Sequence, residues 1–382
     1  MADANHIDTV IIGASAAGLA SAVCLKQHEI PFILLEQYDH VASEWSNRYD
    51  RLHLHTPKNL SGMPYFKIPS IYPTYVSKND YATYLKEYSE TFDVKPLFNQ
   101  KVIRAERKEN MWEVITTKNK FISKNLIVAT GYSGKPVKAT WKGMDHYQGE
   151  IIHSSQYKNG AVYRNKKVLV VGFGNSACEI AICLHEHQAL PSLSVRNGVN
   201  IIPRDLAGIP IINIVIVENW LTKLSPALTD LLNAPVLRLI NGDIKKYGLQ
   251  KLSYGPMTQV TKYKKVPLLD VGTMNLIKKG ILKVYPGIEE IKPGGVKFTD
   301  GREENFDVII AATGFNPAFA EFLQGFEKVS DASGMPLVSG RESGLPGLYF
   351  CGFHASPTGM LREIGIEAKR IARAIRCKVQ GT

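Results

Sequence analysis

Two stretches that each combine a strand, a glycine-rich turn, a helix and a second strand predict an α/β fold with two Rossmann-like dinucleotide-binding domains. The first stretch covers residues 9–36 and the second covers residues 167–196. In addition, a buried-strand pattern that ends in Ala-Thr-Gly occurs twice, at 125–131 and at 307–314. The chain has 382 residues, more than one hydrophobic core usually organises, so two domains are expected.

The first stretch has the spacing of a nucleotide site. Gly13 allows the tight turn from strand to helix, and Gly18 lets the helix pack against the strand, while the helix N-terminus offers free N–H groups to a pyrophosphate. Glu36 follows Gly13 by 23 positions, at the tip of the second strand, where a carboxylate can accept both ribose hydroxyls. An ordinary tight turn is the alternative, and Ser15 replaces the expected second glycine. The predicted cofactor contacts here are Gly13, Ser15, Ala16, Gly18 and Glu36.

The second stretch differs from the first in the charge at its tip. Its turn keeps the first two glycines and has Ala177 as the third, and its second strand ends at Arg196 instead of an acid. An acid repels a 2′-phosphate, whereas arginine pairs with it bidentately, so the first site is predicted to take FAD and the second NADPH. Arg204 is a further candidate, and a solvent-facing arginine is the alternative for both. The predicted contacts are Gly172, Gly174, Asn175, Ser176 and Arg196.

The two Ala-Thr-Gly strands are expected where the chain crosses between the domains. Their small residues allow close backbone approach, so Gly131 and Gly314 are predicted near a cofactor. Near the end, a strand that includes Gly352 precedes a long helix from Gly359 to Arg376, whose N-terminus would suit the electron-rich edge of a flavin. We expect a discontinuous FAD domain, 1–160 and 305–382, with an inserted NADPH domain, 161–304.

Residues 40–76 have no regular period and read as loops laid across a site. The polar or stacking side chains available there are Trp45, Arg51, His53, His55 and Asn59. The alternative for Trp45 is a core aromatic, and for each histidine it is a residue with satisfied hydrogen bonds. Further along, amphipathic patterns predict helices over 78–91, 220–232 and 235–247.

The composition is that of a globular enzyme, with 45% hydrophobic and 21% charged residues and a formal net charge of +11. A positive field attracts anionic cofactors and substrates. No basic run is interleaved with aromatics, so nucleic acid is not an expected partner. The five cysteines form no CxxC pair, which predicts reduced thiols and no metal site. The first residues have no apolar signal core, and the most apolar run, 209–217, is too short to cross a bilayer, so a cytoplasmic protein without an integral membrane segment is expected.

Several motifs resemble the class B flavin-containing monooxygenases, whose signature is FxGxxxHxxxY just ahead of the second nucleotide turn. Residues 147–157 read YQGEIIHSSQY, with Tyr147 in place of the leading Phe. The segments at 153–160, 170–181, 253–273 and 298–315 resemble the plant YUCCA branch, the indole-3-pyruvate monooxygenases. The chain departs from that family at Ser15, at Ala177 and in the segment CGFHASPTGMLREIG at 351–365.

The resemblance implies a cycle in which NADPH reduces FAD, O2 adds to give a C4a-hydroperoxyflavin, and NADP+ shields it from water. It also implies oxidative decarboxylation of indole-3-pyruvate to indole-3-acetate, a step of auxin biosynthesis. The alternatives are N- or S-oxygenation of an amino acid, amine or thioether, and a flavoprotein without oxygenase activity. In this reading, His55 and Asn59 are the catalytic candidates, Trp45 helps to shape the flavin pocket, and Arg51 holds an anionic group.

Overall fold

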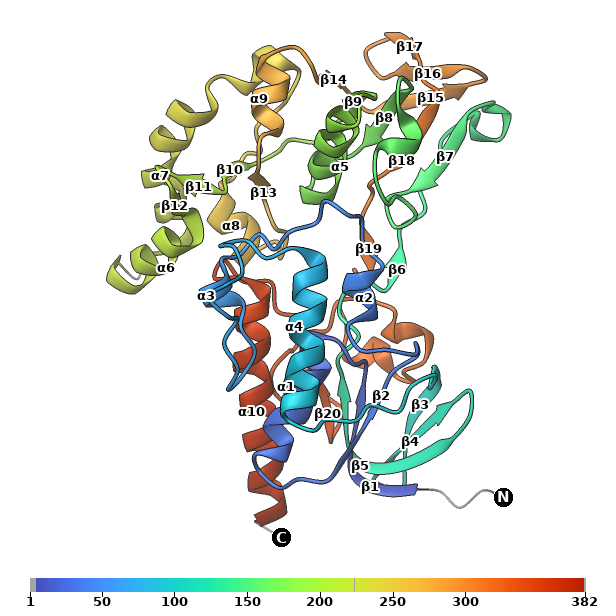
Figure 1. Ribbon diagram of the computed structural model, residues 1–382, viewed down its shortest axis with the longest axis vertical. Coiled ribbons are helices and arrows are strands. Elements are labelled where there is room, and N and C mark those ends of the chain that lie inside the picture. Colours follow the sequence, from blue (N-terminus) through green and yellow to red (C-terminus); the bar gives the residue numbers. More distant parts are fainter. Residues whose placement is uncertain (1–4, 223, 381–382) are drawn as a thin grey trace.

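The computed structural model describes residues 5–222 and 224–380, and the two largest of its sheets are built largely of parallel strands (Figure 1). The first sheet has the strand order β2-β1-β5-β4-β3, with β20 also paired to β5. Strands β2, β1, β5 and β20 are parallel, whereas β5, β4 and β3 form an antiparallel meander. The bounds are β1 Asn5–Ile12, β2 Phe32–Leu35, β3 Val102–Lys108, β4 Met111–Thr116, β5 Lys120–Val128 and β20 Leu348–Phe350.

The side chains of β1 alternate between the two faces of the first sheet, and both faces are covered. Ile11 packs under the helices α1 (Ala16–Lys26), α4 (Lys78–Thr91) and α10 (Met360–Gln380). Val10 and Ile12 point to the other face, where Phe319 and Phe350 close the core. Every residue of α1 from Ala16 to Leu25 is buried, because its small side chains let α4 and α10 pack against it. The predicted helix over 78–91 is confirmed.

The second sheet is parallel throughout, in the order β14-β9-β8-β18-β7. Its helix α5 (Asn175–Glu186) covers one face, and a small meander of β15, β16 and β17 covers the other. Strands β7 and β18 lie outside the interval 161–304, so domain borders that follow the sheets would fall near 150 and 311. The bounds are β7 Glu150–His153, β8 Lys167–Val171, β9 Leu190–Ser194, β14 Lys283–Tyr285, β15 Ile288–Lys292, β16 Gly295–Phe298, β17 Glu303–Asn305 and β18 Val308–Ala311.

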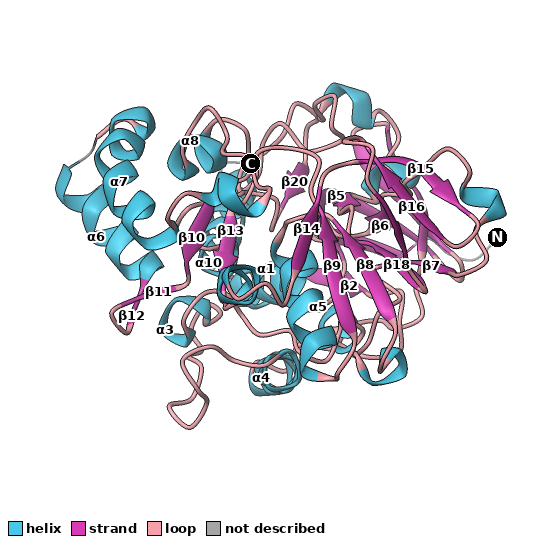
Figure 2. Ribbon diagram, turned by 90° about the horizontal axis from the view of Figure 1, so that it is seen from above, coloured by secondary structure: helices cyan, strands magenta, loops and turns pink. Residues whose placement is uncertain are grey.

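A mainly helical excursion leaves the second unit after β10 and returns at β13, and it forms one edge of the molecule (Figure 2). The helices predicted over 220–232 and 235–247 are wrong in their bounds. The apolar run itself forms α6, and α7 continues through Pro235, because Ser225 and Pro226 start α7 earlier and the proline is tolerated inside it. The elements are β10 Ile201–Pro203, β11 Asp205–Leu206, β12 Ile209–Pro210, α6 Ile211–Thr222, α7 Pro226–Asn241, η3 Ile244–Tyr247, α8 Pro256–Thr261, β13 Leu268–Asp270 and α9 Thr273–Lys278.

The remaining elements are short and lie in the connections. They are α2 Ser43–Ser46, α3 Lys58–Ser61, β6 Lys135–Pro136, β19 Phe315–Asn316 and the 3-10 helices η1 Met144–His146, η2 Ala161–Tyr163, η4 Phe319–Glu321 and η5 Phe326–Lys328. All five cysteines are free thiols. Across the described ranges, no helix combines the length and the apolar character that a membrane span requires.

Candidate active site

The first glycine turn connects β1 to α1, and at two of its positions the backbone leaves room for glycine alone. Gly13 has a φ of +101°, and a Cβ there would lie 2.9 Å from the Ala129 carbonyl oxygen. A Cβ on Gly18 would lie 1.7 Å from the Gly13 carbonyl oxygen, so the helix start fits directly against the turn. Ser15 is the N-cap residue but its side chain makes no capping bond, and α1 begins at Ala16. The N–H groups of the first helical turn thus stay available for an anion.

Glu36 follows β2 and lies beside this turn, as the spacing predicted. Its side chain is almost wholly buried, with Oε2 accepting a hydrogen bond from Ala14 N at 2.7 Å and Oε1 accepting one from Tyr38 N at 3.1 Å. Burial raises the pKa of the Glu36 carboxyl, and these backbone N–H groups oppose the rise. The sheet therefore presents a fixed carboxylate at the edge of the first turn, the chemistry that a ribose diol requires.

The second glycine turn repeats this geometry between β8 and α5. Gly172 has a φ of +126°, and a Cβ there would lie 2.7 Å from the Ala312 carbonyl oxygen. Around Gly174, the N-cap of α5, no described atom lies within 4 Å of an added Cβ. Asn175 uses its Oδ1 to accept a bond from Leu269 N at 2.8 Å, which ties the helix start to β13. Ser176 is the second residue of α5, and its side chain is partly buried.

The two candidate arginines at the second turn have different surroundings. Arg196 follows β9 and is exposed, and within the described ranges it forms no ion pair. Arg204 is engaged: its Nε lies 3.1 Å from Asp205 Oδ2, and its guanidinium stacks 3.9 Å from the centre of the Tyr75 ring. Arg196 is thus the arginine that is available to an added anion.

The Ala-Thr-Gly segments leave open space beside their glycines. Gly131 and Gly314 have φ values of +66° and +90°, and no described atom lies within 4 Å of a Cβ built on either. The Thr130 hydroxyl, next to Gly131, is buried without a hydrogen-bond partner among the described residues. A bound cofactor would occupy the open space beside these glycines. It would also give the buried Thr130 hydroxyl a hydrogen-bond partner.

Gly352 allows close packing against α1, and its N–H contacts a buried acid, Glu367, that the sequence reasoning missed. A Cβ on Gly352, whose φ is +87°, would lie 2.9 Å from Ala17 Cβ, so glycine permits the contact with α1. Its N–H donates to Glu367 Oε2 at 2.6 Å, while Glu367 Oε1 has no partner in the described part of the chain. Burial raises the pKa of the Glu367 carboxyl.

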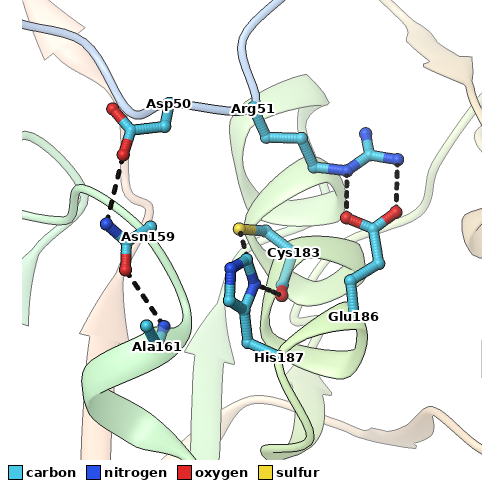
Figure 3. A pocket seen from close by; sticks show the side chains of 7 residues that line it. All are labelled: Asp50, Arg51, Asn159, Ala161, Cys183, Glu186 and His187. Carbon is cyan, nitrogen blue, oxygen red and sulfur yellow. Dashed lines mark hydrogen bonds and ion pairs between the residues drawn. The ribbon is translucent and has the colours of Figure 1, made fainter.

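The candidate site residues of the loops at 40–76 lie in different parts of the structure. Trp45 is partly buried and packs edge-on against Tyr81, with ring centres 4.7 Å apart, and Asn59 is exposed on α3. Arg51 pairs bidentately with Glu186, at 2.9 and 3.0 Å, in a surface cavity (Figure 3). Glu186 ends α5, whereas Gly174 starts it, and a helix of 12 residues is about 18 Å long. Arg51 therefore lies far from the second glycine turn.

His55 belongs to a largely buried cluster with two residues that sequence reasoning missed. Its Nε2 hydrogen-bonds Glu179 Oε1, and Glu179 Oε2 accepts a bond from the Tyr49 hydroxyl at 2.9 Å. Glu179 is 3% exposed and lies on α5, one turn after Gly174. Burial, then the adjacent Glu179 carboxylate, raises the pKa of Tyr49, so Tyr49 stays a neutral donor. The cluster joins the loop of the first unit to the helix of the second.

A signal for Glu179 exists in the sequence. The residues from Ala177 to Leu184 are all buried, and Glu179 is the acid among apolar or small neighbours. A carboxylate on the buried face of a helix requires a partner, because an unpaired buried charge is costly. The apolar neighbours of Glu179 in the sequence therefore indicate that its carboxylate needs a partner, although they do not show which residue the partner is.

Comparison with known proteins agrees with this geometry. The family model described as flavin-binding monooxygenase-like matches residues 7–335. The chain is 37% identical to the indole-3-pyruvate monooxygenase YUCCA8 of Oryza sativa subsp. indica, over 98% of this chain and 91% of that protein. It is 39% identical to the probable indole-3-pyruvate monooxygenase YUCCA1 of Arabidopsis thaliana, over 90% of this chain and 84% of that protein.

Solved structures confirm the predicted fold class. A flavin-containing monooxygenase from Stenotrophomonas maltophilia superimposes with a TM-score of 0.75 at 20% identity, covering 98% of this chain and 99% of that one. The structure of OTEMO in complex with FAD and NADP gives a TM-score of 0.71 at 20% identity, covering 98% of this chain and 86% of that one. The chain belongs to the flavin-binding monooxygenase-like family and is a flavin monooxygenase similar to the YUCCA indole-3-pyruvate monooxygenases.

Proposed function

We propose that the chain binds FAD at the first glycine turn and NADPH at the second, and oxygenates a 2-oxo acid. The reaction we favour is oxidative decarboxylation of indole-3-pyruvate to indole-3-acetate. The observation that carries the cofactor assignment is the contrast between a buried Glu36 at the first turn and an exposed Arg196 at the second. The substrate assignment is supported by relatives named as indole-3-pyruvate monooxygenases at 37–39% identity.

Several residues of this chain fit the proposed cofactors. The uncapped start of α1 would receive the FAD pyrophosphate, and Glu36 would receive the ribose. The open space around a Cβ at Gly131 or Gly314 leaves the backbone at these two positions accessible to the cofactors. When bound and reduced, the flavin would supply the electrons that activate O2.

The protein's own task is to hold its groups in place and to keep water out. His55 is held by Glu179 across the two units, so its imidazole cannot turn freely, and the loop that carries it contacts α5 through Tyr49 as well. An exposed cation at Arg196 and a net charge of +11 favour entry of anionic ligands. Asn59, on the exposed side of α3, stays a candidate whose place near the flavin is predicted from the sequence alone.

Product analysis tests the reaction. With NADPH, O2 and indole-3-pyruvate, we expect one carbon dioxide and one indole-3-acetate for each NADPH that is consumed in coupled turnover. Amines, amino acids and thioethers are the competing substrates, and formation of an oxime, hydroxylamine or sulfoxide instead of carbon dioxide would assign the enzyme to the N- or S-oxygenating reaction. NADPH consumption that does not depend on O2 would contradict both reactions.

Changing Arg196 to alanine tests the second nucleotide site. Because a charge-assisted pair with the 2′-phosphate would be lost, the KM for NADPH should rise about 10-fold or more, while use of NADH changes little. Steady-state kinetics with both coenzymes measure this. Arg204→Ala is the matched control, since Arg204 already pairs with Asp205 and should affect both coenzymes equally. An equal rise for NADPH and NADH in Arg196→Ala would contradict the assignment.

A further inference from the structure

Helix α7 turns an apolar face to the outside of the molecule. Its exposed positions recur at intervals of three and four residues, which places them in one stripe along the helix. The exposed fractions of the aliphatic side chains in this stripe are 41% for Leu228, 69% for Leu231, 57% for Leu232, 47% for Val236 and 86% for Leu239. A helix on the surface of a globular protein normally buries such a stripe, so this orientation requires an explanation.

The polar side of α7 holds the helix in this orientation. Asp230 accepts hydrogen bonds from Met257 N at 2.8 Å and Thr258 N at 2.9 Å, which caps the start of α8. Thr229 is buried beside it. At the other end, Asn241 donates to the Ile201 carbonyl oxygen at 2.9 Å. The polar contacts that anchor the helix therefore face the protein, and the leucines face away from it.

The position of α7 extends this surface. Helices α6 and α7 lie together at one edge of the molecule, away from both sheets, in the two views (Figures 1 and 2). Ile209 and Val217, which belong to β12 and α6, are 52% and 54% exposed. Together with the stripe on α7, these aliphatic side chains are called the ridge.

Basic side chains lie next to the C-terminal half of α7. Arg238 is exposed on the helix itself, and Lys245 and Lys246 are exposed in the following turn. Lys278 reaches the end of the helix, with its Nζ 3.2 Å from the Ile240 carbonyl oxygen. The described acids of α7 and its following turn both have backbone partners: Asp230 caps α8, and Asp243 accepts a bond from Lys245 N at 3.1 Å. The ridge therefore combines aliphatic and positive character.

We propose that α7 docks on the surface of an anionic lipid bilayer, with its leucines among the acyl chains and its cations at the headgroups. A helix with an aliphatic face and basic flanks is the form that binds at such an interface. A symmetric contact with a second copy would bring the same cations together. A protein partner typically anchors on aromatic residues and arginine in a pocket, whereas the exposed side chains that make up the ridge are aliphatic. The proposal is independent of the substrate assignment.

Vesicle co-sedimentation of the full chain tests the docking surface. Wild-type protein should sediment with vesicles of phosphatidylcholine and phosphatidylserine, and much less with phosphatidylcholine alone. The double variant Leu231→Ser/Leu239→Ser should lower the fraction bound at least about 10-fold, because two aliphatic side chains no longer enter the bilayer. Lys245→Gln/Lys246→Gln should weaken binding to the anionic vesicles, and added salt should weaken it in wild type.

A matched control uses aliphatic residues of similar exposure elsewhere. Ile71 and Leu337 are 88% and 64% exposed, so Ile71→Ser/Leu337→Ser removes comparable surface and should bind as wild type does. Circular dichroism should show that every variant is folded. Absence of vesicle binding by wild type, or equal loss in both double variants, would overturn the proposal. A wild-type dimer in light scattering that Leu231→Ser/Leu239→Ser converts to monomer would also overturn it, and would assign the ridge to a second copy.

Discussion

Replacing Gly13 with valine should yield a protein that purifies without flavin. The φ of +101° at this position is strained for a β-branched residue by about 1–2 kcal/mol, and the new Cβ would lie 2.9 Å from the Ala129 carbonyl oxygen. The turn must open to relieve both, which displaces the start of α1 from the position where it would receive the pyrophosphate. The absorption spectrum of the purified protein measures the result, since loss of the flavin bands is visible directly.

Two further variants separate loss of the site from loss of the fold. Gly301 has a φ of +84° in an exposed turn, and no described atom lies within 4 Å of a Cβ built on it. Gly301→Val therefore introduces a similar backbone strain far from the first turn, and this variant should keep its flavin. Gly131→Ala adds one methyl group to the open space beside the first turn and should weaken flavin binding, while it unfolds only a few degrees below wild type because alanine at the φ of +66° costs about 1–2 kcal/mol. A yellow, fully loaded Gly13→Val protein would contradict the site assignment.

The two glycine turns were predictable because their signals are local. A strand, a turn that needs a positive φ, and a helix follow one another within residues 5–26 in the first unit and within 167–186 in the second, and each requirement is visible as a residue type. The acid or base at the tip of the next strand follows from the same spacing. These features predict an acid after the second strand of the first unit and a base after that of the second, and the structure has Glu36 and Arg196 there; their roles toward cofactors stay predictions.

Contacts between the units could not be predicted in this way. The pairs His55–Glu179 and Arg51–Glu186 join residues more than a hundred positions apart, and both depend on how the loop at 40–76 crosses α5. A charged residue shows that it needs a partner but not where the partner is. Arg51 accordingly finds a carboxylate at the end of α5, whereas the sequence suggested a cofactor anion for it.

The helical excursion shows a different limit. The sequence predicts separate helices over 220–232 and 235–247, yet α7 runs through Pro235, because its start at Ser225 and Pro226 and the polar contacts of its buried side fix the helix as a whole. The apolar run before it forms α6, although its β-branched residues favour strands. In both places the tertiary contacts outweigh local propensity, and these contacts are not visible in a single sequence.

Changing Glu179 to glutamine should lower the coupled oxygenation rate about 10-fold or more while the protein keeps its flavin, since a positioning partner of an active-site group typically has an effect of this size. The variant retains the side-chain volume but removes the negative charge that holds the imidazole of His55. An imidazole free to rotate leaves the junction between the units less ordered and more open to water, so a larger share of the NADPH consumed should yield hydrogen peroxide instead of product. Oxygen, peroxide and product measured together give this ratio.

Tyr49→Phe is the control that distinguishes positioning from a simple structural tie. It removes the other hydrogen bond on Glu179, at 2.9 Å, and leaves the contact with His55 in place. We expect both variants to unfold a few degrees earlier than wild type, since each loses a buried interaction of about 1–3 kcal/mol. Only Glu179→Gln should uncouple NADPH use from oxygenation. If both variants lose stability and coupling to the same extent, then Glu179 holds the two units together without positioning His55, and the role assigned to the cluster is wrong.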